Sequence, residues 1–423
     1  MDLSSVKNTI QQERNFTLRR AVERLREGIF DPFAVQLLTA REDKLVRAFD
    51  QGLSSPGDNF SPHLCVCGDY GQGKSHSLAY LQEKALEDGF ATSMINLDPR
   101  EVPFHDFRQV YRALLARIRF PDHEGTFFSR WRSWSEDFSA GRTHRSAPTE
   151  RAKDNGNRIL AALPDEMPHF FKAMLTAAAN KTIPLSHKKK ALKKHRQYRP
   201  REFPFLLKRA LSGTIVPVYR LRNVCKYRSV DFYKSSPLKC TNPHDYLTQI
   251  FCMADLFKQM GYKGWVVLFD EGESIAQTRI TSRSKSYQYL HRIFLNSPAV
   301  TGLYPIFAFT DDFFFRLKEE NYDRIRVTKK GESFYFDMNY AHAWKSLDVH
   351  RLHDLSGQEW NELTRKLLLL HTRAYKWAPE NGRIQEEMET VLAQTVNRET
   401  RLRMQSLINQ LDMAHQEQVL RLP

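Results

Sequence analysis

GDYGQGKSHSL (residues 68–78) contains the pattern Gly-x-x-x-x-Gly-Lys-Ser, which is typical of a loop that holds phosphate groups. The pattern is informative where a strand precedes it and a helix follows it, because the loop and the helix N-terminus must converge on the phosphates. Both flanks fit: HLCVCG (63–68) is a short apolar run typical of a buried strand, and residues 75–88 have helical periodicity and end at Gly89. We therefore expect an α/β fold of the P-loop NTPase class, with a parallel sheet.

Each residue type in this loop has a chemical role at a nucleotide. Lys74 is placed to reach the β- and γ-phosphates, and Ser75 to ligate Mg²⁺. The alternative is a glycine-rich turn with an incidental lysine, which the flanking strand and helix disfavour. The expected ligands are therefore ATP and Mg²⁺. The other residues expected to surround them are Gly68, Asp69, Tyr70, Gly71, Gln72, Gly73 and His76.

A second apolar run, WVVLFDEGE (265–273), ends in carboxylates. A buried strand tolerates carboxylates at the exposed carboxyl edge of a sheet, where ligands bind in α/β proteins. Asp270 is expected to hold Mg²⁺ through water, and Glu271 to act as general base on the attacking water, with Glu273 as a second candidate. Taken alone, the pattern also fits a strand that runs into a solvated turn, so its meaning depends on the phosphate loop.

A third strand, YPIFAFTDD (304–312), carries Thr310 near its end. The hydroxyl could help to position the attacking water, or it could cap the helix that follows. Arginine side chains would stabilise the charge that develops on the γ-phosphate. Arg401 on a C-terminal helix is the first candidate, although a solvated surface charge is the ordinary role of a single arginine. The competing arginines are Arg398 and Arg403 beside it, and Arg324 and Arg326, which could also serve a neighbouring subunit.

The chain of 423 residues carries a net charge of +15, from 64 Lys and Arg against 49 Asp and Glu. Residues 181–228 contain 15 of these cations and a single acidic residue, Glu202, so nearly the whole excess is local. A local basic excess favours a polyanion partner, and we expect DNA bound without sequence specificity. A solvated charged helix, or a patch that meets an acidic protein, is the alternative. The expected DNA contacts are Lys188, Lys189, Lys190, Lys193, Lys194, Arg196, Arg199 and Arg201.

Aromatic residues lie among these charges and could stack on the bases of a single strand. No recognition helix or zinc-finger pattern is visible, so readout of a specific sequence is not indicated. The aromatic residues are Tyr198, Phe203, Phe205, Tyr219 and Tyr227.

Composition excludes some classes of protein. No stretch approaches the ~20 apolar residues of a membrane span, and the polar N-terminus lacks the apolar region of a secretory signal. We therefore expect a cytoplasmic protein without a membrane partner. The five cysteines form no C-x-x-C pair, and Cys65 and Cys67 alternate within an apolar run, which predicts buried thiols rather than zinc ligands.

The chain divides into four expected segments. Residues 1–120 would hold N-terminal helices and the first part of the ATPase domain, and residues 121–243 a largely helical basic insertion. Within the insertion, residues 131–156 are polar and predict a loop or a partly ordered segment. Residues 244–345 would complete the ATPase domain, and residues 346–423 would form a helical C-terminal lid domain.

Beyond these motifs, the chain resembles the ATP-binding proteins of bacterial BREX phage-defence systems, of the BrxD type, within the AAA+/ORC-like P-loop ATPases. The resemblance implies an ATPase that helps a defence system to discriminate or act on foreign DNA, with other defence-system proteins as partners. The stretches that carry it, in the family's order, are AVERLREGIFDPFAVQLLTAREDKL (21–45), GDYGQGKSHSL, INLDPREVPFHDFRQVYRALL (95–115), GYKGWVVLFDEGESI (261–275), GLYPIFAFTDDFF (302–314) and LTRKLLLLHTRAYKW (363–377).

The resemblance also implies roles for single residues. Arg41, with Glu42, matches the segment that helps to hold the adenine. Gly272 departs from the pattern, since many relatives have Ala there. Residues 121–240 match the family least, so the expected DNA contacts rest on charge. The remaining matches are Lys74 and Ser75 for Walker A, Asp270 and Glu271 for Walker B, Thr310 for the sensor on the third strand and Arg401 for the C-terminal sensor arginine.

Two other functions stay open. One is a nucleotide-gated scaffold that binds ATP, recruits partner proteins and shows little turnover. The other is an initiator ATPase of the replication or transposition type, which would need a DNA-reading domain. Either protein, or the expected ATPase, could form a homo-oligomer.

Overall fold

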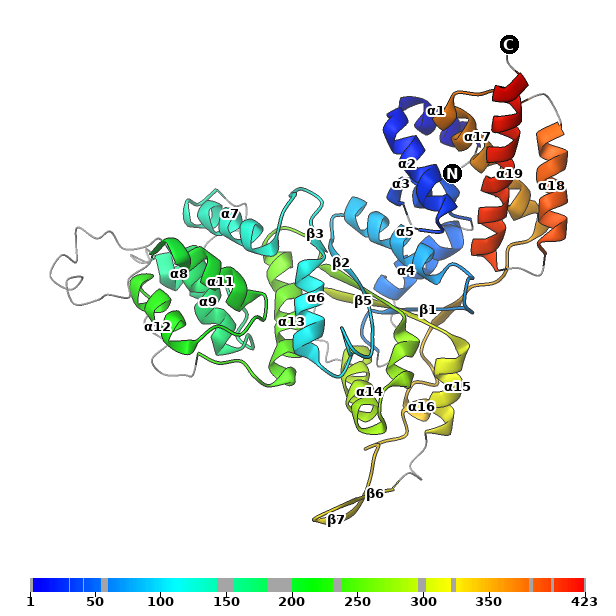
Figure 1. Ribbon diagram of the computed structural model, residues 1–423. Helices are drawn as coiled ribbons and strands as arrows, with labels where there is room; N and C mark the ends of the chain where they lie inside the picture. The colour runs from blue at the N-terminus through cyan, green and yellow to red at the C-terminus, as the bar shows by residue number, and fades with distance from the viewer. Residues whose placement is uncertain are drawn as a thin grey trace.

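The computed structural model describes residues 3–29, 31–40, 42–54, 60–142, 155–180, 200–230, 238–295, 302–320, 325–379, 383–396 and 399–421. Three parts follow one another across the molecule: a helical insertion, a central sheet with its covering helices, and a helical domain (Figure 1). Both ends of the chain lie in the helical domain.

The central sheet has six strands in the order β3-β2-β4-β5-β1-β8. All neighbouring strands pair in parallel except β2 and β3. The α/β class with a mostly parallel sheet is therefore confirmed, and β1, β4 and β5 coincide with the apolar runs that predict strands. The strands are β1 (Leu64–Cys67), β2 (Ala91–Asn96), β3 (Ile118–Arg119), β4 (Trp265–Asp270), β5 (Leu303–Phe309) and β8 (Val349–Arg351).

Helices cover both faces of the sheet, which explains the continuous apolar sequence of its strands. Successive side chains of β1 enter different cores: Leu64 and Val66 pack toward α4 and α5, whereas Cys65 belongs to the core on the opposite face. Cys65 and Cys67 are both buried, as expected. The covering helices are α4 (Glu42–Ser54), α5 (Lys74–Glu87), α6 (Phe107–Ala116), α13 (Pro243–Gln259) and α14 (Ile280–Phe294).

The insertion contains several short helices. The loop predicted over 131–156 is wrong at its start, because a helix continues to Ser139. Trp131 and Trp134 lie on one face of that helix and are buried in the core, which outweighs the polar residues between them. The described helices are α7 (Phe127–Ser139), α8 (Asn155–Ala161), α9 (His169–Ala179), the 3-10 turn η2 (Pro200–Glu202), α11 (Phe203–Leu211) and α12 (Val218–Tyr227).

The helical domain joins the two ends of the chain around one apolar core. The C-terminal helices expected to form a lid therefore share their core with N-terminal helices, which the order of the sequence does not indicate. The members are α1 (Leu3–Gln12), α2 (Asn15–Arg26), α3 (Pro32–Leu38), α17 (Gly357–Tyr375), α18 (Arg383–Gln394) and α19 (Thr400–Arg421).

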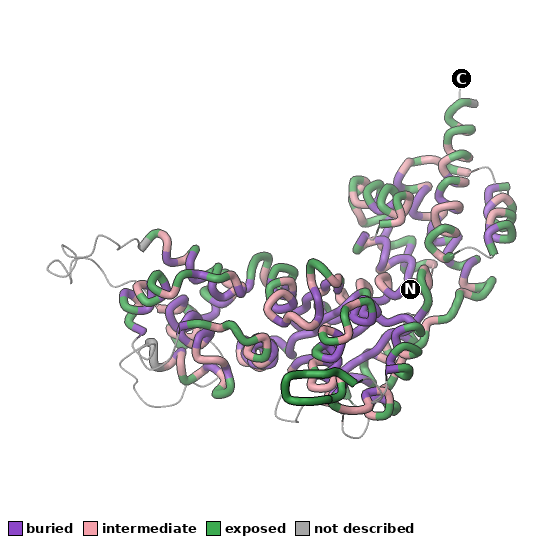
Figure 2. The backbone as a smooth tube through the Cα atoms, turned by 60° about the horizontal axis from the view of Figure 1, so that its bottom comes forward, coloured by how far each residue is buried: buried purple, intermediate pink, exposed green. Residues whose placement is uncertain are grey.

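Several short elements lie between strands of the central sheet in the chain. The hairpin of β6 and β7 projects from the central part and is exposed along both strands (Figures 1 and 2). Within the described ranges, no helix has both the length and the apolar character needed to cross a membrane. The short elements are η4 (Gly272–Gln277), α15 (Asp311–Glu319), β6 (Ile325–Thr328), β7 (Gly331–Phe334) and α16 (Tyr340–Ala343).

Candidate active site

The phosphate loop connects β1 to α5 at the carboxyl edge of the sheet. Gly71 and Gly73 have φ values of +81° and +94°, a conformation that side chains disfavour, so glycine is required at both positions. Gly73 is the N-cap of α5, and no side chain caps that helix. The N–H groups of the first turn of α5 are therefore available to an anion, and the positive end of the helix dipole favours one. This cradle fits a phosphate chain.

Lys74 is nearly buried at the start of α5, with 7% of its surface exposed. Its Nζ donates to the carbonyl oxygens of Gly68 at 2.9 Å and Asp69 at 3.2 Å, and it lies 4.9 Å from the centre of the Tyr70 ring. The ammonium group also lies 3.8 Å from Glu273 Oε1. The cation is thus held inside the loop, where a phosphate chain would replace weak neutral acceptors with charged ones.

Asp270 is the last residue of the fully buried strand β4, and Glu271 follows it directly. Asp270 has 3% of its surface exposed, and its Oδ1 accepts the N–H of Glu271 at 3.0 Å. Glu271 has a left-handed backbone, with φ of +56°, so the chain turns sharply and the side chain is exposed in the cleft. Loss of solvation and the neighbouring Asp270 raise the pKa of Glu271 above its ordinary value. A raised pKa brings the carboxylate closer to the range of an effective general base.

Gly272 is explained by a close approach of η4 to β5. A Cβ atom at this position would lie 2.5 Å from the carbonyl oxygen of Ala308 and 2.6 Å from the Phe309 ring. Glycine therefore lets the chain after Glu271 lie against β5. This contact accounts for the departure from the family pattern noted in the sequence.

Glu273 is buried close to Lys74, and burial raises its pKa. In the part of the chain that the structure describes, neither of its carboxylate oxygens has a hydrogen-bond partner. The side chain therefore has the position expected of a second carboxylate but faces the lysine, whereas Glu271 faces the cleft.

Thr310 follows β5, which lies between β1 and β4 in the sheet. This order places the threonine between the phosphate loop and the carboxylates. Thr310 is the N-cap residue of α15, but its side chain makes no capping hydrogen bond. Its Oγ1 is buried and has no hydrogen-bond partner among the described residues. The capping alternative does not explain this hydroxyl, which remains available to a bound group.

A cleft of about 800 Å³ separates the sheet edge from the helical domain. On the sheet side, the predicted residues Lys74, Ser75, Asp270 and Glu271 line it. On the opposite side lie Arg401 of α19 and parts of α2 and α3. Ser75 and Asp270, which supply the oxygen ligands that Mg²⁺ prefers, thus face one space together with the loop.

Arg401 lies against the end of α2, where a Cβ atom on Gly28 would come 2.4 Å from the arginine Nε. Its rival Arg403 faces away, stacks 4.1 Å from the centre of the Trp360 ring and donates to the Leu392 carbonyl. Arg326 lies in the exposed hairpin. Arg324 and Arg398 lie outside the described residues, as does the predicted adenine contact Arg41. Arg401 is therefore the predicted arginine that the fold brings to the cleft.

His76, expected among the nucleotide contacts, directs its imidazole toward α3. Its Nε2 lies 2.8 Å from the hydroxyl of Thr39. That hydroxyl donates to the carbonyl of Val35 at 2.6 Å, so His76 Nε2 carries the proton and donates to Thr39. Burial lowers the pKa of His76 to about 4, and the ring is neutral. The side chain thus joins the phosphate helix to the helical domain.

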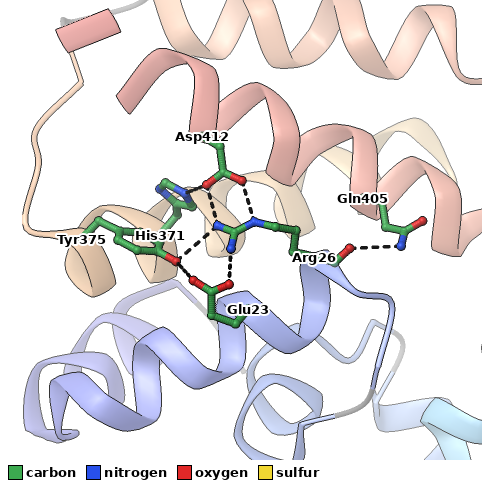
Figure 3. Close-up of polar contacts among 6 residues, drawn as sticks. All are labelled: Glu23, Arg26, His371, Tyr375, Gln405 and Asp412. Atoms are coloured by element: carbon green, nitrogen blue, oxygen red, sulfur yellow. Dashed lines mark hydrogen bonds and ion pairs between the residues drawn. The ribbon is translucent and has the colours of Figure 1, made fainter. Parts of the chain in front are cut away.

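A network of charges fixes α2 against α17 and α19 (Figure 3). Arg26 donates to both carboxylate oxygens of Asp412, with Nε–Oδ2 of 2.8 Å and Nη2–Oδ1 of 2.7 Å. The same guanidinium contacts Glu23 and the hydroxyl of Tyr375. Gln405 of α19 donates to the backbone carbonyl of Arg26 at 3.1 Å. Arg26 is the last residue of α2, so the network holds α19 close to Gly28, which Arg401 contacts.

His371 also belongs to this network, and its imidazole ring is neutral. Its Nδ1 accepts the indole N–H of Trp377 at 2.9 Å, so its Nε2 carries the proton and donates to Asp412 at 3.0 Å. Burial lowers the pKa of His371, although Asp412 opposes this shift. This tautomer satisfies both partners without a charge.

The sequence did not indicate two further residues at the cleft. Glu399 lies against the phosphate loop, since a Cβ atom on Gly71 would come 2.8 Å from its Cβ. Arg351 ends β8, lines the cleft and forms an ion pair with Asp311, the residue after Thr310. β8 has only three residues, and its sequence VHR has no clear strand pattern, so no signal marked Arg351. Glu399 directly precedes α19, and its closeness in sequence to the predicted Arg401 was the only signal for it.

The basic segment is described only in part. The predicted DNA contacts from Lys188 to Arg199, together with Tyr198, lie outside the described residues, whereas Arg201 is exposed. Phe203 and Tyr227 are buried, with ring centroids 6.2 Å apart, so stacking on bases by these two residues was wrongly predicted. Their burial holds α11 against α12. Phe205 and Tyr219 are exposed and remain candidates.

The chain was compared with known families and proteins. No curated protein matches it. The model of the BREX system ATP-binding protein BrxC/D family matches residues 16–150 and 240–422, which is well over half of the chain. The matched parts contain the phosphate loop, the carboxylates, Thr310 and Arg401, and the unmatched part contains the basic segment. The chain therefore belongs to the BREX system ATP-binding protein BrxC/D family.

Proposed function

We propose that this protein is an Mg²⁺-dependent ATPase of a BREX-like defence system, of the BrxD type, with an AAA+/ORC-like P-loop fold. Its ATP cycle drives a conformational or assembly step among defence-system proteins, and its basic segment binds DNA. The observation that carries the ATPase assignment is the convergence on one sheet edge of the phosphate loop, Asp270, Glu271 and the unpartnered hydroxyl of Thr310. The sheet order β2-β4-β5-β1-β8 supports it, because β5 carries Thr310 between the loop and the carboxylates.

Each residue has a task in this proposal. Lys74 exchanges the carbonyl oxygens of Gly68 and Asp69 for phosphate oxygens. Ser75 and Asp270 hold Mg²⁺, which neutralises charge on the phosphates when it is bound. Glu271 accepts a proton from the attacking water, and its raised pKa suits that role.

Two other residues act from neighbouring elements. Thr310 orients the attacking water through its hydroxyl, which has no other partner among the described residues. Arg401 stabilises negative charge from the helical domain, so the full site forms only when both walls of the cleft are in place.

A pair of carboxylate variants tests the base assignment. In Glu271→Gln, ATP binding should persist while phosphate release falls by about 10²-fold or more, because the amide cannot accept the proton. Glu273→Gln is the matched control, since that residue faces Lys74 and should retain most of the turnover. Loss of turnover in the control alone would transfer the role of base to Glu273.

Wild-type turnover separates the ATPase from a nucleotide-gated scaffold. ATP binding without measurable phosphate release, with and without DNA, would favour the scaffold.

For the DNA assignment, charge reversal of five lysines should abolish binding to random duplex, and unchanged affinity would remove the basic segment as the DNA site. A discrete footprint on DNA would instead favour an initiator. The five lysines are Lys188, Lys189, Lys190, Lys193 and Lys194.

A further inference from the structure

The β6–β7 hairpin has no part in the proposed ATPase chemistry. It extends from α15 toward α16, and every residue of both strands is exposed. Val327 has 80% of its surface exposed, and Ile325 and Phe334 are about half exposed. A two-stranded hairpin is only marginally stable alone in water, so apolar side chains displayed on one point to a partner surface.

The register of the hairpin separates its two faces. Ile325 pairs with Phe334, and Val327 pairs with Glu332. Side chains at paired and alternate positions share a face of a sheet, so the three apolar residues lie together. They form one compact apolar cluster on a face that also carries Glu332, opposite Val327.

The rest of the hairpin is basic. Arg326 pairs with Ser333 on the second face, and its Nε donates to the serine hydroxyl at 3.1 Å. Lys329 and Lys330 form the turn and are exposed. Residues 325–334 thus carry three cations against one acidic side chain, Glu332. The charge is complementary to a polyanion.

The end of α15, which precedes the hairpin in the chain, is fixed to the first turns of α14. Glu320, the last described residue before the hairpin, is buried, forms an ion pair with Arg283 and accepts the hydroxyl of Tyr287 at 2.8 Å. Arg283 also donates to the carbonyl oxygens of Ala276, at 3.4 Å, and Thr278. These carbonyls belong to η4 and its end, which follow Glu271 directly.

The outgoing end is fixed to the same turns. Ser284 Oγ donates to the backbone carbonyl of Tyr335 at 2.6 Å. Phe336 stacks on Tyr287, with ring centroids 5.6 Å apart. Residues 283–287 of α14 therefore hold both the outgoing end of the hairpin and Glu320 at the end of α15, and Arg283 among them also holds the segment after the carboxylates.

We propose that the hairpin is a contact for a nucleic-acid strand, with Lys329 and Lys330 on its phosphates and Phe334 against a base, and that binding there acts on the carboxylate segment through α14. The inference rests on the proposed function, because it adds a second nucleic-acid contact to the one proposed for the basic segment.

The size of the hairpin favours this occupant over a protein. A stable protein interface needs about 800 Å² from each partner, or about 20–30 residues a side. The hairpin offers two strands of four residues, and lysines beside short strands discourage pairing with another chain. A phosphodiester strand needs only a few charged contacts and one stacked base.

Fluorescence anisotropy with labelled single-stranded and duplex oligonucleotides between 50 and 200 mM salt tests the contact. In the full chain, Lys329→Ala with Lys330→Ala should lower the slope of log K against log salt by about 1.4 on single strands and about 1.8 on duplex. Lys7→Ala with Arg24→Ala is the matched control, since both cations are exposed on helices of the helical domain. The control should keep the wild-type slope.

Phe334→Ser tests the apolar face, and it should weaken single-strand binding about 10-fold. Phosphate release tests the coupling: the double lysine variant should keep its rate without DNA but lose stimulation by DNA.

Each contrary result has a distinct meaning. A wild-type slope in the hairpin variants, with binding abolished by charge reversal in the basic segment, overturns the hairpin contact and leaves the proposed function standing. A change in sedimentation instead of DNA affinity shows that the hairpin binds a second copy, which also overturns it. If the wild-type chain binds neither single-stranded nor duplex DNA, the DNA part of the proposed function fails. Loss of stimulation in the Lys7 and Arg24 control would overturn the coupling.

Discussion

The two walls of the cleft are built in different ways. The sheet wall places Lys74, Asp270 and Thr310 within a few residues of the ends of buried strands, so backbone pairing fixes their positions. The opposite wall places Arg401 on α19 and Glu399 directly before it, and the position of α19 depends on contacts between helices from both ends of the chain. The sheet therefore sets the positions of Lys74, Asp270 and Thr310, whereas helix packing in the helical domain sets those of Glu399 and Arg401.

This difference has consequences for stability. The strands of the sheet wall are buried on both faces, whereas the helical wall is held partly by a network of charges that solvent reaches. Segments with solvent-exposed polar contacts open at lower cost than a sheet core. We expect substitutions in the sheet wall to act on turnover, and substitutions in the network to act on stability.

The largest effect should follow a change in the sheet wall. Lys74→Ala should reduce phosphate release by about 10²–10³-fold, because it removes a donor that meets developing charge on the phosphates. The free energy of unfolding should change little, since the lysine mainly contacts carbonyl oxygens of its own loop, and the buried Glu273 beside it, whose pKa burial raises, can take up a proton when the cation is removed. Phosphate release and chemical denaturation on the same variant measure both quantities. A large loss of stability would mean that the lysine is structural.

The second effect lies in the opposite wall. Arg401→Ala should lower turnover by about 10-fold or somewhat more, as expected for a lost hydrogen bond to a charged group. Arg403→Ala provides the contrast, because that arginine stacks on Trp360 away from the cleft and its loss should lower the melting temperature instead. Equal losses of turnover in both variants would remove the special role of Arg401.

The sheet wall is also the wall that the sequence predicts well. Apolar runs that end in glycines or carboxylates mark β1 and β4, and the local pattern also places Lys74, Asp270 and Glu271 together at the cleft. The left-handed turn at Glu271 and the need for glycine at position 272 were not foreseen, because they depend on the approach of β5.

The opposite wall was predicted only at Arg401. The pairing of α2 with α17 and α19 joins residues more than 340 positions apart, and no local pattern records such a contact. Arg351 was missed for a similar reason, since β8 is too short to show a period. In the insertion, the charge pattern predicted accessible aromatics, but packing of α11 on α12 buries Phe203 and Tyr227.

A smaller effect should come from the network itself. Arg26→Ala should lower the free energy of unfolding by about 1.5–3 kcal/mol, because Asp412 loses two charged hydrogen bonds. Arg24→Ala on the same helix is the matched control, since Arg24 is exposed and should change stability little. Chemical denaturation measures both. Equal stability of the two variants would show that solvent replaces the Arg26 contacts without cost.

The smallest effect is a dependence of stability on pH through His371. Its folded-state pKa is lowered from the ordinary value near 6.5, so below that pH the unfolded chain takes up a proton that the folded chain refuses. Stability should therefore be retained above pH 6.5 and fall as the pH drops, by at most about 1.4 kcal/mol per pH unit from this group. His371→Gln keeps a neutral donor for Asp412 and an acceptor for Trp377. The variant should therefore lose less stability than the wild-type protein as the pH falls from 7.5 to 5.5. Other buried histidines contribute equally to the wild-type protein and the variant, so the difference between their melting temperatures at each pH isolates His371. Melting temperatures that change in parallel with pH would show that the network does not depend on the neutral form of His371.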